Sequence, residues 1–169
     1  WHMRLTDRDT EILKTLRTKC RCLTLKQTAR TWWPLNRQAE SDARRRLGKL
    51  PVAMFTSVAP ELPDVSTPLL RWLPGDDPPH FERISYFAKT RFGKPVQTTF
   101  VTSANGRSSR LSEYVHDALL SEVYLTHFHP DSESRFIHED QFTDWRGEKR
   151  PDAILRCHTD PGKSVVIEC

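Results

Sequence analysis

The sequence predicts an α+β protein in two parts, a helical head and a mixed α/β body. Three short helical patterns fill residues 1–50, and strand-like segments mixed with helical ones follow from residue 51 onwards. Charge divides the chain at the same place. The first 50 residues hold 13 Lys and Arg against 5 Asp and Glu, and residues 51–169 hold 13 against 17. The net charge of +4 is thus a head at +8 and a body at −4, a pattern typical of nucleic-acid contact through one part of a chain.

Capping signals predict the first two helices. Thr6 with Asp9, and Thr24 with Gln27, place a hydroxyl and an acidic or amide side chain three residues apart, which is the pattern of a capping box. The second helix must end at Pro34, because proline offers no donor and clashes with a preceding helical turn. The apolar stripes behind these caps consist of Ile12, Leu13 and Leu16, and of Leu25, Ala29 and Trp32 or Trp33.

The third predicted helix runs from about Arg37 to Lys49 and has two unlike faces. Ala39, Ala43 and Leu47 recur every four residues and predict the buried face. Helical steps of 100° place Gln38, Ser41, Arg45 and Lys49 on the opposite, outward face, where their side chains can donate hydrogen bonds to phosphates and to base edges. We therefore predict DNA contact through Arg37, Gln38, Ser41, Arg44, Arg45, Arg46 and Lys49, with Arg44 and Arg46 reaching the sugar-phosphate backbone. The alternative is a three-helix packing unit whose arginines are only solvated.

Two predicted strands complete the head. A β-prone stretch at 52–58, a Pro-rich loop at 59–68 and a second short strand at 69–73 follow the helices. Three helices followed by a two-stranded wing is the order of a winged helix, which we expect over residues 1–75. The turn-rich segment PGDDPP at 74–79 predicts the domain boundary.

The body is predicted to contain a helix at 80–92, a strand at 96–101 and a long helix at 110–128. The apolar stripe expected on the long helix consists of Leu111, Val115, Leu119 and Val123. His116 and Asp117 lie beside that stripe. A histidine in such a position is more often packed and hydrogen-bonded than catalytic, and we interpret His116 in that way.

A hairpin is predicted at the end of the chain, with strands at 150–156 and 164–168 around a turn at 159–163. If it centres near Asp160, facing residue numbers sum to 320, and Asp152 faces Glu168. Two adjacent carboxylates suit Mg²⁺, as in nucleases with a P-D-x(n)-(D/E)-x-K motif. Asp152 and Glu168 are therefore the candidate catalytic and metal-binding residues if the protein is a nuclease. The alternative is a proline-started strand and a terminal surface acid.

Five stretches resemble the replication-relaxation family of plasmid and mobile-element proteins: LTDRDTEILKTLRTKCRCLTLKQTARTWW, ARRRLGKL, LSEYVHDALLSEVYLTHF, RPDAIL and VVIEC. The resemblance implies a winged-helix head and, over residues 76–169, a domain similar to restriction endonucleases. By this resemblance Arg44, Arg45 and Arg46 belong to the recognition helix, and Asp152 and Glu168 to the nuclease motif. The motif lysine would be residue 170, after the last residue given. Either the chain stops short of the full domain, or the domain has lost catalysis and acts as a scaffold.

The expected function is that of a DNA-binding regulator or accessory factor in plasmid or mobile-element replication or transcription. The alternatives are a Mg²⁺-dependent nuclease guided by the winged helix, and a winged helix that contacts protein. The expected partner is double-stranded DNA, and a homodimer is a further alternative. We expect no cofactor, except Mg²⁺ if the protein is a nuclease. No apolar run reaches the roughly 20 residues of a membrane span. Four scattered cysteines without disulfide or zinc spacing predict buried or free thiols and a cytoplasmic location.

Overall fold

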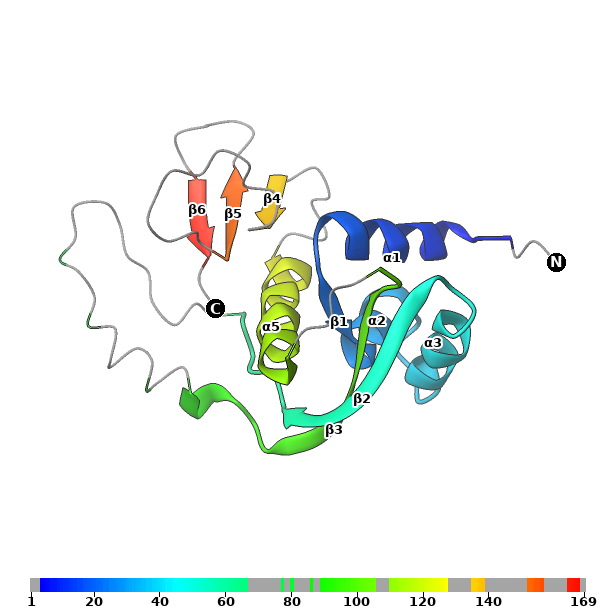
Figure 1. Ribbon diagram of the computed structural model, residues 1–169, viewed down its shortest axis with the longest axis horizontal. Coiled ribbons are helices and arrows are strands. Elements are labelled where there is room, and N and C mark those ends of the chain that lie inside the picture. The colour runs from blue at the N-terminus through cyan, green and yellow to red at the C-terminus, as the bar shows by residue number, and fades with distance from the viewer. Residues whose placement is uncertain are drawn as a thin grey trace.

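The computed structural model describes residues 4–66, 77, 80, 86, 89–105, 110–127, 135–138, 152–156 and 164–167 (Figure 1). It confirms an α+β protein. The elements are α1 (Asp7–Thr18), β1 (Cys22–Thr24), α2 (Leu25–Trp32), α3 (Ala39–Leu47), β2 (Val52–Pro60), β3 (Pro95–Ser103), α5 (Leu111–His127), β4 (Arg135–His138), β5 (Ala153–Arg156) and β6 (Ser164–Ile167). Of the helix predicted at 80–92, the residues described as helical are Tyr86 and residues 89–91.

The first sheet is antiparallel, with strand order β1-β3-β2. Its longest ladder joins β2 to β3, from Val52 opposite Ser103 to Pro60 opposite Pro95. The partner of β2 is therefore β3, which lies further along the chain than the second wing strand expected at 69–73, a segment outside the described residues. The predicted boundary after residue 75 falls in the connection between these two paired strands. Residues on both sides of that boundary therefore build one sheet.

Both predicted capping boxes are present. The backbone N–H of Thr6 donates to Asp9 Oδ2 at 2.7 Å, and the backbone N–H of Asp9 donates back to Thr6 Oγ1 at 3.3 Å. At α2 the corresponding distances for Thr24 and Gln27 are 2.7 and 3.1 Å. The side chains buried behind these caps include Ile12, Leu16, Leu25, Ala29 and Trp33. The local signals for α1 and α2 were therefore correct.

Helix α5 packs on β1 and α2 through polar as well as apolar side chains. Buried Gln27 donates from Nε2 to the Ala118 carbonyl at 2.8 Å, and buried Ser121 donates from Oγ to the Cys22 carbonyl at 2.6 Å. The buried face of α5 consists of Asp117, Ala118, Leu120, Ser121, Tyr124 and Leu125. The predicted stripe of Leu111, Val115, Leu119 and Val123 is therefore wrong as the buried face, and Leu111 is 39% exposed. The hydrogen bonds of α5 with Gln27 and Cys22 set the rotation of this helix about its own axis. The spacing of apolar residues in the sequence gives no sign of such polar contacts.

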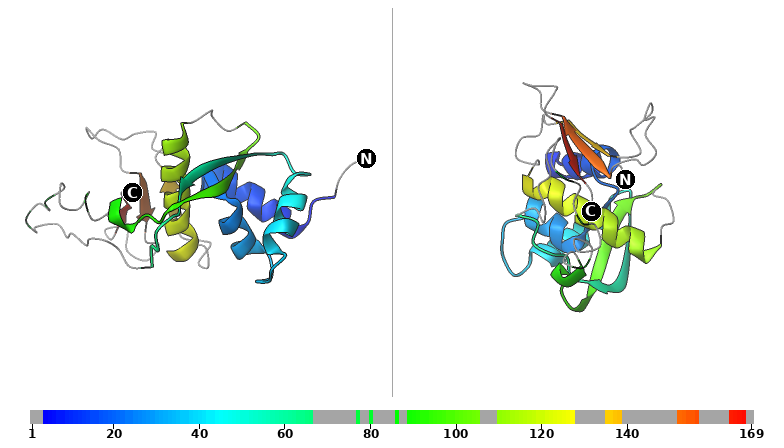
Figure 2. Two further views of the ribbon diagram at one scale, coloured as in Figure 1. Left: turned by 90° about the horizontal axis from the view of Figure 1, so that it is seen from below. Right: turned by 90° about the vertical axis from the view of Figure 1, so that its left-hand side faces the viewer.

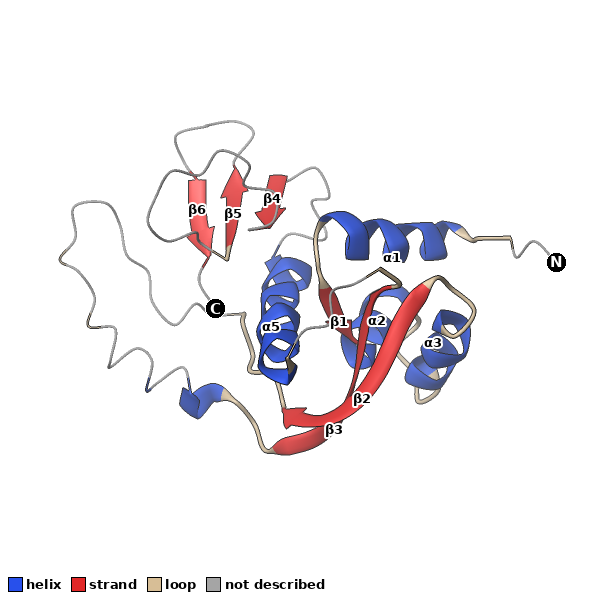
Figure 3. Cartoon of the chain, viewed as in Figure 1, coloured by secondary structure: helices blue, strands red, loops and turns tan. Residues whose placement is uncertain are grey.

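A second antiparallel sheet has the order β4-β5-β6 and lies apart from the first (Figure 3). Ala153 faces Ile167 and Ile154 faces Val166, which confirms the predicted hairpin register. Ala153 is fully buried in the same cluster of side chains as Ile12 of α1 and Tyr124 of α5. The left view in Figure 2 places α5 and this sheet together, on the side of the molecule away from α3. The body thus shares a core with the head without covering α3.

Cys20 and Cys22 are buried free thiols, as expected. Burial raises the pKa of Cys20 to about 12, so this thiol stays protonated and unreactive at neutral pH. Cys157 and Cys169 lie outside the described residues. Within the described part of the chain, no helix combines the length and the apolar character needed to cross a membrane.

Candidate nucleic-acid interface

Helix α3 has the two faces that its sequence predicts. Ala39, Ala43 and Leu47 are buried against the rest of the head. The side chains predicted to face outward are all exposed: Gln38, Ser41, Arg45 and Lys49. Arg37, in the connection before the helix, is exposed as well. A helix face made of amide, hydroxyl and cationic side chains is therefore open to a partner.

The three consecutive arginines of α3 point in different directions, because each step along a helix turns by about 100°. Arg44 Nη2 donates to Thr99 Oγ1 of β3 at 2.8 Å. Arg45 extends outward, with its side chain 76% exposed, and pairs with Asp42 at 2.9 Å. Arg46 turns toward α1 and pairs with Asp9. Adjacent residues of one type therefore have three different surroundings.

Arg46 and Asp9 form a two-point ion pair that ties α3 to α1. Arg46 Nε lies 3.0 Å from Asp9 Oδ1, Nη2 contacts Oδ2, and Nη2 also donates to the Arg4 carbonyl at 3.2 Å. Asp9 is fully buried. The hydrogen bonds from Arg46 hold the pKa of Asp9 well below its usual range, so the carboxylate is charged at any ordinary pH. We therefore assign Arg46 to positioning α3, whereas Arg45 is available to a partner.

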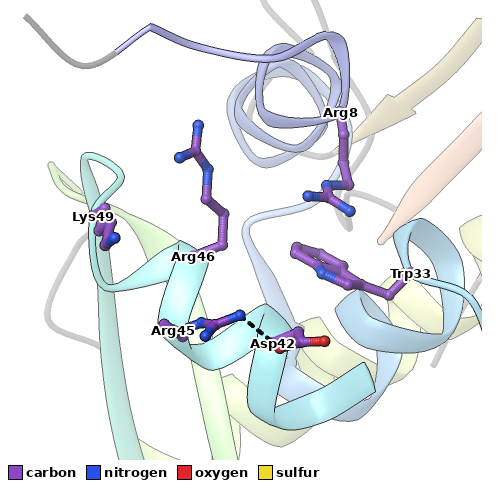
Figure 4. A pocket seen from close by; sticks show the side chains of 6 residues that line it. All are labelled: Arg8, Trp33, Asp42, Arg45, Arg46 and Lys49. Carbon is purple, nitrogen blue, oxygen red and sulfur yellow. Dashed lines mark hydrogen bonds and ion pairs between the residues drawn. The ribbon is translucent and has the colours of Figure 1, made fainter. Parts of the chain in front are cut away.

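A pocket of about 410 Å³ lies between α1 and α3 (Figure 4). It is lined by Arg8, Trp33, Asp42, Arg45, Arg46 and Lys49. The guanidinium of Arg8 stacks over the Trp33 ring at 4.1 Å from its centroid. Sequence reasoning did not find Arg8 or Trp33 as site residues, because no local pattern links α1 or the end of α2 to α3. Only the packing of these elements brings the six side chains together.

A separate cluster of charged side chains links α5 to the start of β5. His116 Nε2 lies 3.2 Å from Asp152 Oδ2, and Nδ1 lies 3.4 Å from Asp117 Oδ1. Asp117 also lies 3.9 Å from Arg21. The carboxylates of Asp117 and then Asp152 raise the pKa of His116 to about 10, so the imidazole is protonated at neutral pH. His116 is hydrogen-bonded in the way that the sequence predicts.

Asp152, one of the two predicted Mg²⁺ ligands, is paired with a side chain of α5. Its Oδ2 atom lies beside the protonated imidazole of His116, so a divalent cation at that oxygen would compete with this positive charge. No three His, Cys, Asp or Glu side chains among the described residues are arranged to hold a metal ion. Glu168 lies outside these residues, so its position opposite Asp152 stays a prediction. The nuclease alternative stays a prediction with it.

The ion pairs of His116 predict a dependence of stability on pH. Folding raises the pKa of His116, so the charged imidazole stabilises the folded state. This contribution to the free energy of unfolding is complete below about pH 6.5 and is lost as pH rises toward about 10. The side chain is 35% exposed, so solvent screening reduces the effect to about 1 kcal/mol. We expect His116→Gln to be less stable than the natural chain at pH 7 and the gap to close by pH 10, measured by urea denaturation. A gap that stays constant with pH would contradict this, and His80→Gln, at an exposed position, is the control.

No protein-family model, no curated protein and no solved structure matches the chain. The resemblance to the replication-relaxation family therefore stays a prediction.

Proposed function

We propose that this protein binds double-stranded DNA through α3, as a winged helix does. The observation that carries the proposal is the outward face of α3. Ser41 and Arg45 of α3, Gln38 at its N-cap and Lys49 just after its end are all exposed, in the most basic part of the chain. An α-helix fits the major groove of B-DNA, where side chains of these types bond to base edges and phosphates.

The order of the elements supports the same proposal. Helix, strand, two helices and two long strands follow one another, and the first strand joins the last in a three-stranded sheet. In a winged helix the third helix reads the DNA and the last two strands form the wing. Here those elements would be α3 and the ladder of β2 with β3.

The surroundings of each side chain suggest its role. Gln38 and Ser41, near the start of α3, are suited to base edges because an amide or hydroxyl group can both donate and accept. Arg37, Arg45 and Lys49 are suited to phosphates. Arg44 is held against Thr99 of the sheet, on the side from which a wing would approach the backbone of the DNA.

In this proposal the body supports the head. Figure 1 shows α5 on the side of β1 and α2 away from α3, so the proposed DNA face stays open. Because Asp152 is paired with His116, we assign that carboxylate to docking the hairpin on α5. The biological role implied by the family resemblance is that of a regulator or accessory factor of plasmid or mobile-element replication or transcription.

Arg45→Ala tests the proposal directly. Arg45 is exposed and, among the described residues, pairs only with Asp42 of its own helix, so the substitution should leave the free energy of unfolding within about 0.5 kcal/mol of the natural value. We expect it to weaken binding to a fluorescent duplex about tenfold at low salt, measured by anisotropy, and to reduce the slope of log affinity against log salt by about 0.9.

Arg17→Ala is the matched control, since Arg17 is an exposed arginine in the last turn of α1. It should bind duplex nearly as well as the natural chain. Equal affinity of both variants for duplex, or a natural chain without salt-dependent binding, would contradict the proposal. The second result would favour a winged helix that contacts protein.

A further inference from the structure

The pocket between α1 and α3 has an excess of positive charge. Arg45 is balanced by Asp42, and Arg46 by Asp9 behind it. Arg8 and Lys49 also line the pocket, and in the described part of the chain neither forms an ion pair. The two lie on different elements. An anion is therefore the ligand that this pocket favours.

Within the described residues, Arg8 is held in place by an aromatic ring and not by a carboxylate. Its guanidinium stacks on Trp33, a buried side chain, so the plane of the charged group is fixed before any ligand arrives. Its Nε–H is buried and has no hydrogen-bond partner among the described residues. A buried donor without an acceptor is costly, and an anion bound beside the guanidinium would offset part of that cost. Figure 4 shows Arg8 directed from α1 toward the pocket, with Arg46 directed toward α1 from α3.

The position of the pocket favours a DNA backbone as the source of the anion. Arg45 and Lys49 belong both to the pocket lining and to the outward face of α3. A duplex that lies along α3 would therefore carry its backbone past the mouth of the pocket. A volume of about 410 Å³ lies in the range of pockets that take a small organic ligand, which leaves room for a phosphodiester and its sugar.

We infer that the pocket between α1 and α3 is a clamp for one backbone phosphate of the DNA, with Arg8 and Lys49 as its donors and Trp33 as the support that orients Arg8. This inference rests on the proposed function, and it adds a contact from α1 to those of α3. The clamp fixes how far α3 enters the groove, because Arg46 and Asp9 hold α1 and α3 in one arrangement.

The test compares two variants that lose the same charge. Arg8→Gln should weaken duplex binding about tenfold and reduce the salt slope by about 0.9, the value for one lost phosphate contact. Arg17→Gln is the control, because nine helical steps of 100° place Arg17 on the opposite side of α1 from Arg8. Both are measured as full chains by anisotropy with one duplex. A natural chain that binds duplex while both variants show the same salt slope would overturn the clamp alone, whereas a natural chain without salt-dependent binding would overturn the proposed function.

A second measurement on the natural chain does not depend on how well Arg8→Gln folds. The Nε–H signal of Arg8 in a ¹H–¹⁵N spectrum, assigned with Arg8→Lys, should shift when duplex is added, while that of Arg17 should not. Pyrophosphate is the probe for a free phosphorylated ligand. A shift with pyrophosphate and none with duplex would overturn the clamp in favour of a small-molecule site, and no shift with either would also overturn it.

Discussion

A fragment of residues 1–75 is expected to show no cooperative unfolding transition, whereas a fragment of residues 1–127 should fold. The sheet order β1-β3-β2 is the reason, since β3 is the strand to which both β1 and β2 are hydrogen-bonded. The shorter fragment loses β3, and with it the buried side chains of Phe100 and Val101. Burial of such side chains contributes about 2 kcal/mol each, and loss of both ladders adds to this in a domain of marginal stability.

Circular dichroism with a urea titration distinguishes the two fragments. A third fragment of residues 1–105 keeps β3 but lacks α5, which removes the acceptor of Gln27 at Ala118 and the donor of Ser121 to Cys22. We expect it to unfold at lower urea than residues 1–127. Cooperative unfolding of residues 1–75 would show that the head is a separate domain ending near the predicted boundary, contrary to the pairing of β3.

Asp9→Asn should lower the free energy of unfolding by about 2 kcal/mol at pH 7. The substitution keeps the shape of the side chain and removes the charge that Arg46 pairs with in a buried position. Breaking a fully buried pair costs more, but Arg46 is partly exposed and water screens its outer edge. Urea denaturation of the full chain measures the difference. Asp7→Asn, the same change in the same first turn at an exposed site, should cost less than about 0.5 kcal/mol.

The effect of Asp9→Asn should also depend on pH in a defined direction. Because the pKa of Asp9 is lowered on folding, its contribution to stability is complete above about pH 4 and declines as pH falls below the unfolded value of 3.8. The gap between the natural chain and Asp9→Asn should therefore narrow in acid. A gap that widens there, or a similar loss of stability in Asp7→Asn, would show that Asp9 does not act through its ionised pair with Arg46.

Local features of this fold were predictable from the sequence. Thr6 with Asp9, and Thr24 with Gln27, form capping boxes because every group involved lies within three residues. The buried face of α3 followed from its period, and the register of the final hairpin followed from its turn. Long-range features were not predictable in this way. The partner of β2 and the rotation of α5 depend on contacts between segments far apart in the chain.

The candidate interface shows most clearly which features follow from the local sequence and which depend on long-range contacts. The pattern of residues was enough to predict that α3 is amphipathic, that Arg45 lies on its exposed face, and that the head holds the positive charge. The packing of α1 against α3 was needed to show that Arg46 is bound to Asp9, 37 residues earlier, and that Arg8 joins α3 across a pocket. Periodicity reports the direction of a side chain relative to its own helix axis. The charged group that lies next to the side chain depends on which other helix or strand packs against that face of the helix.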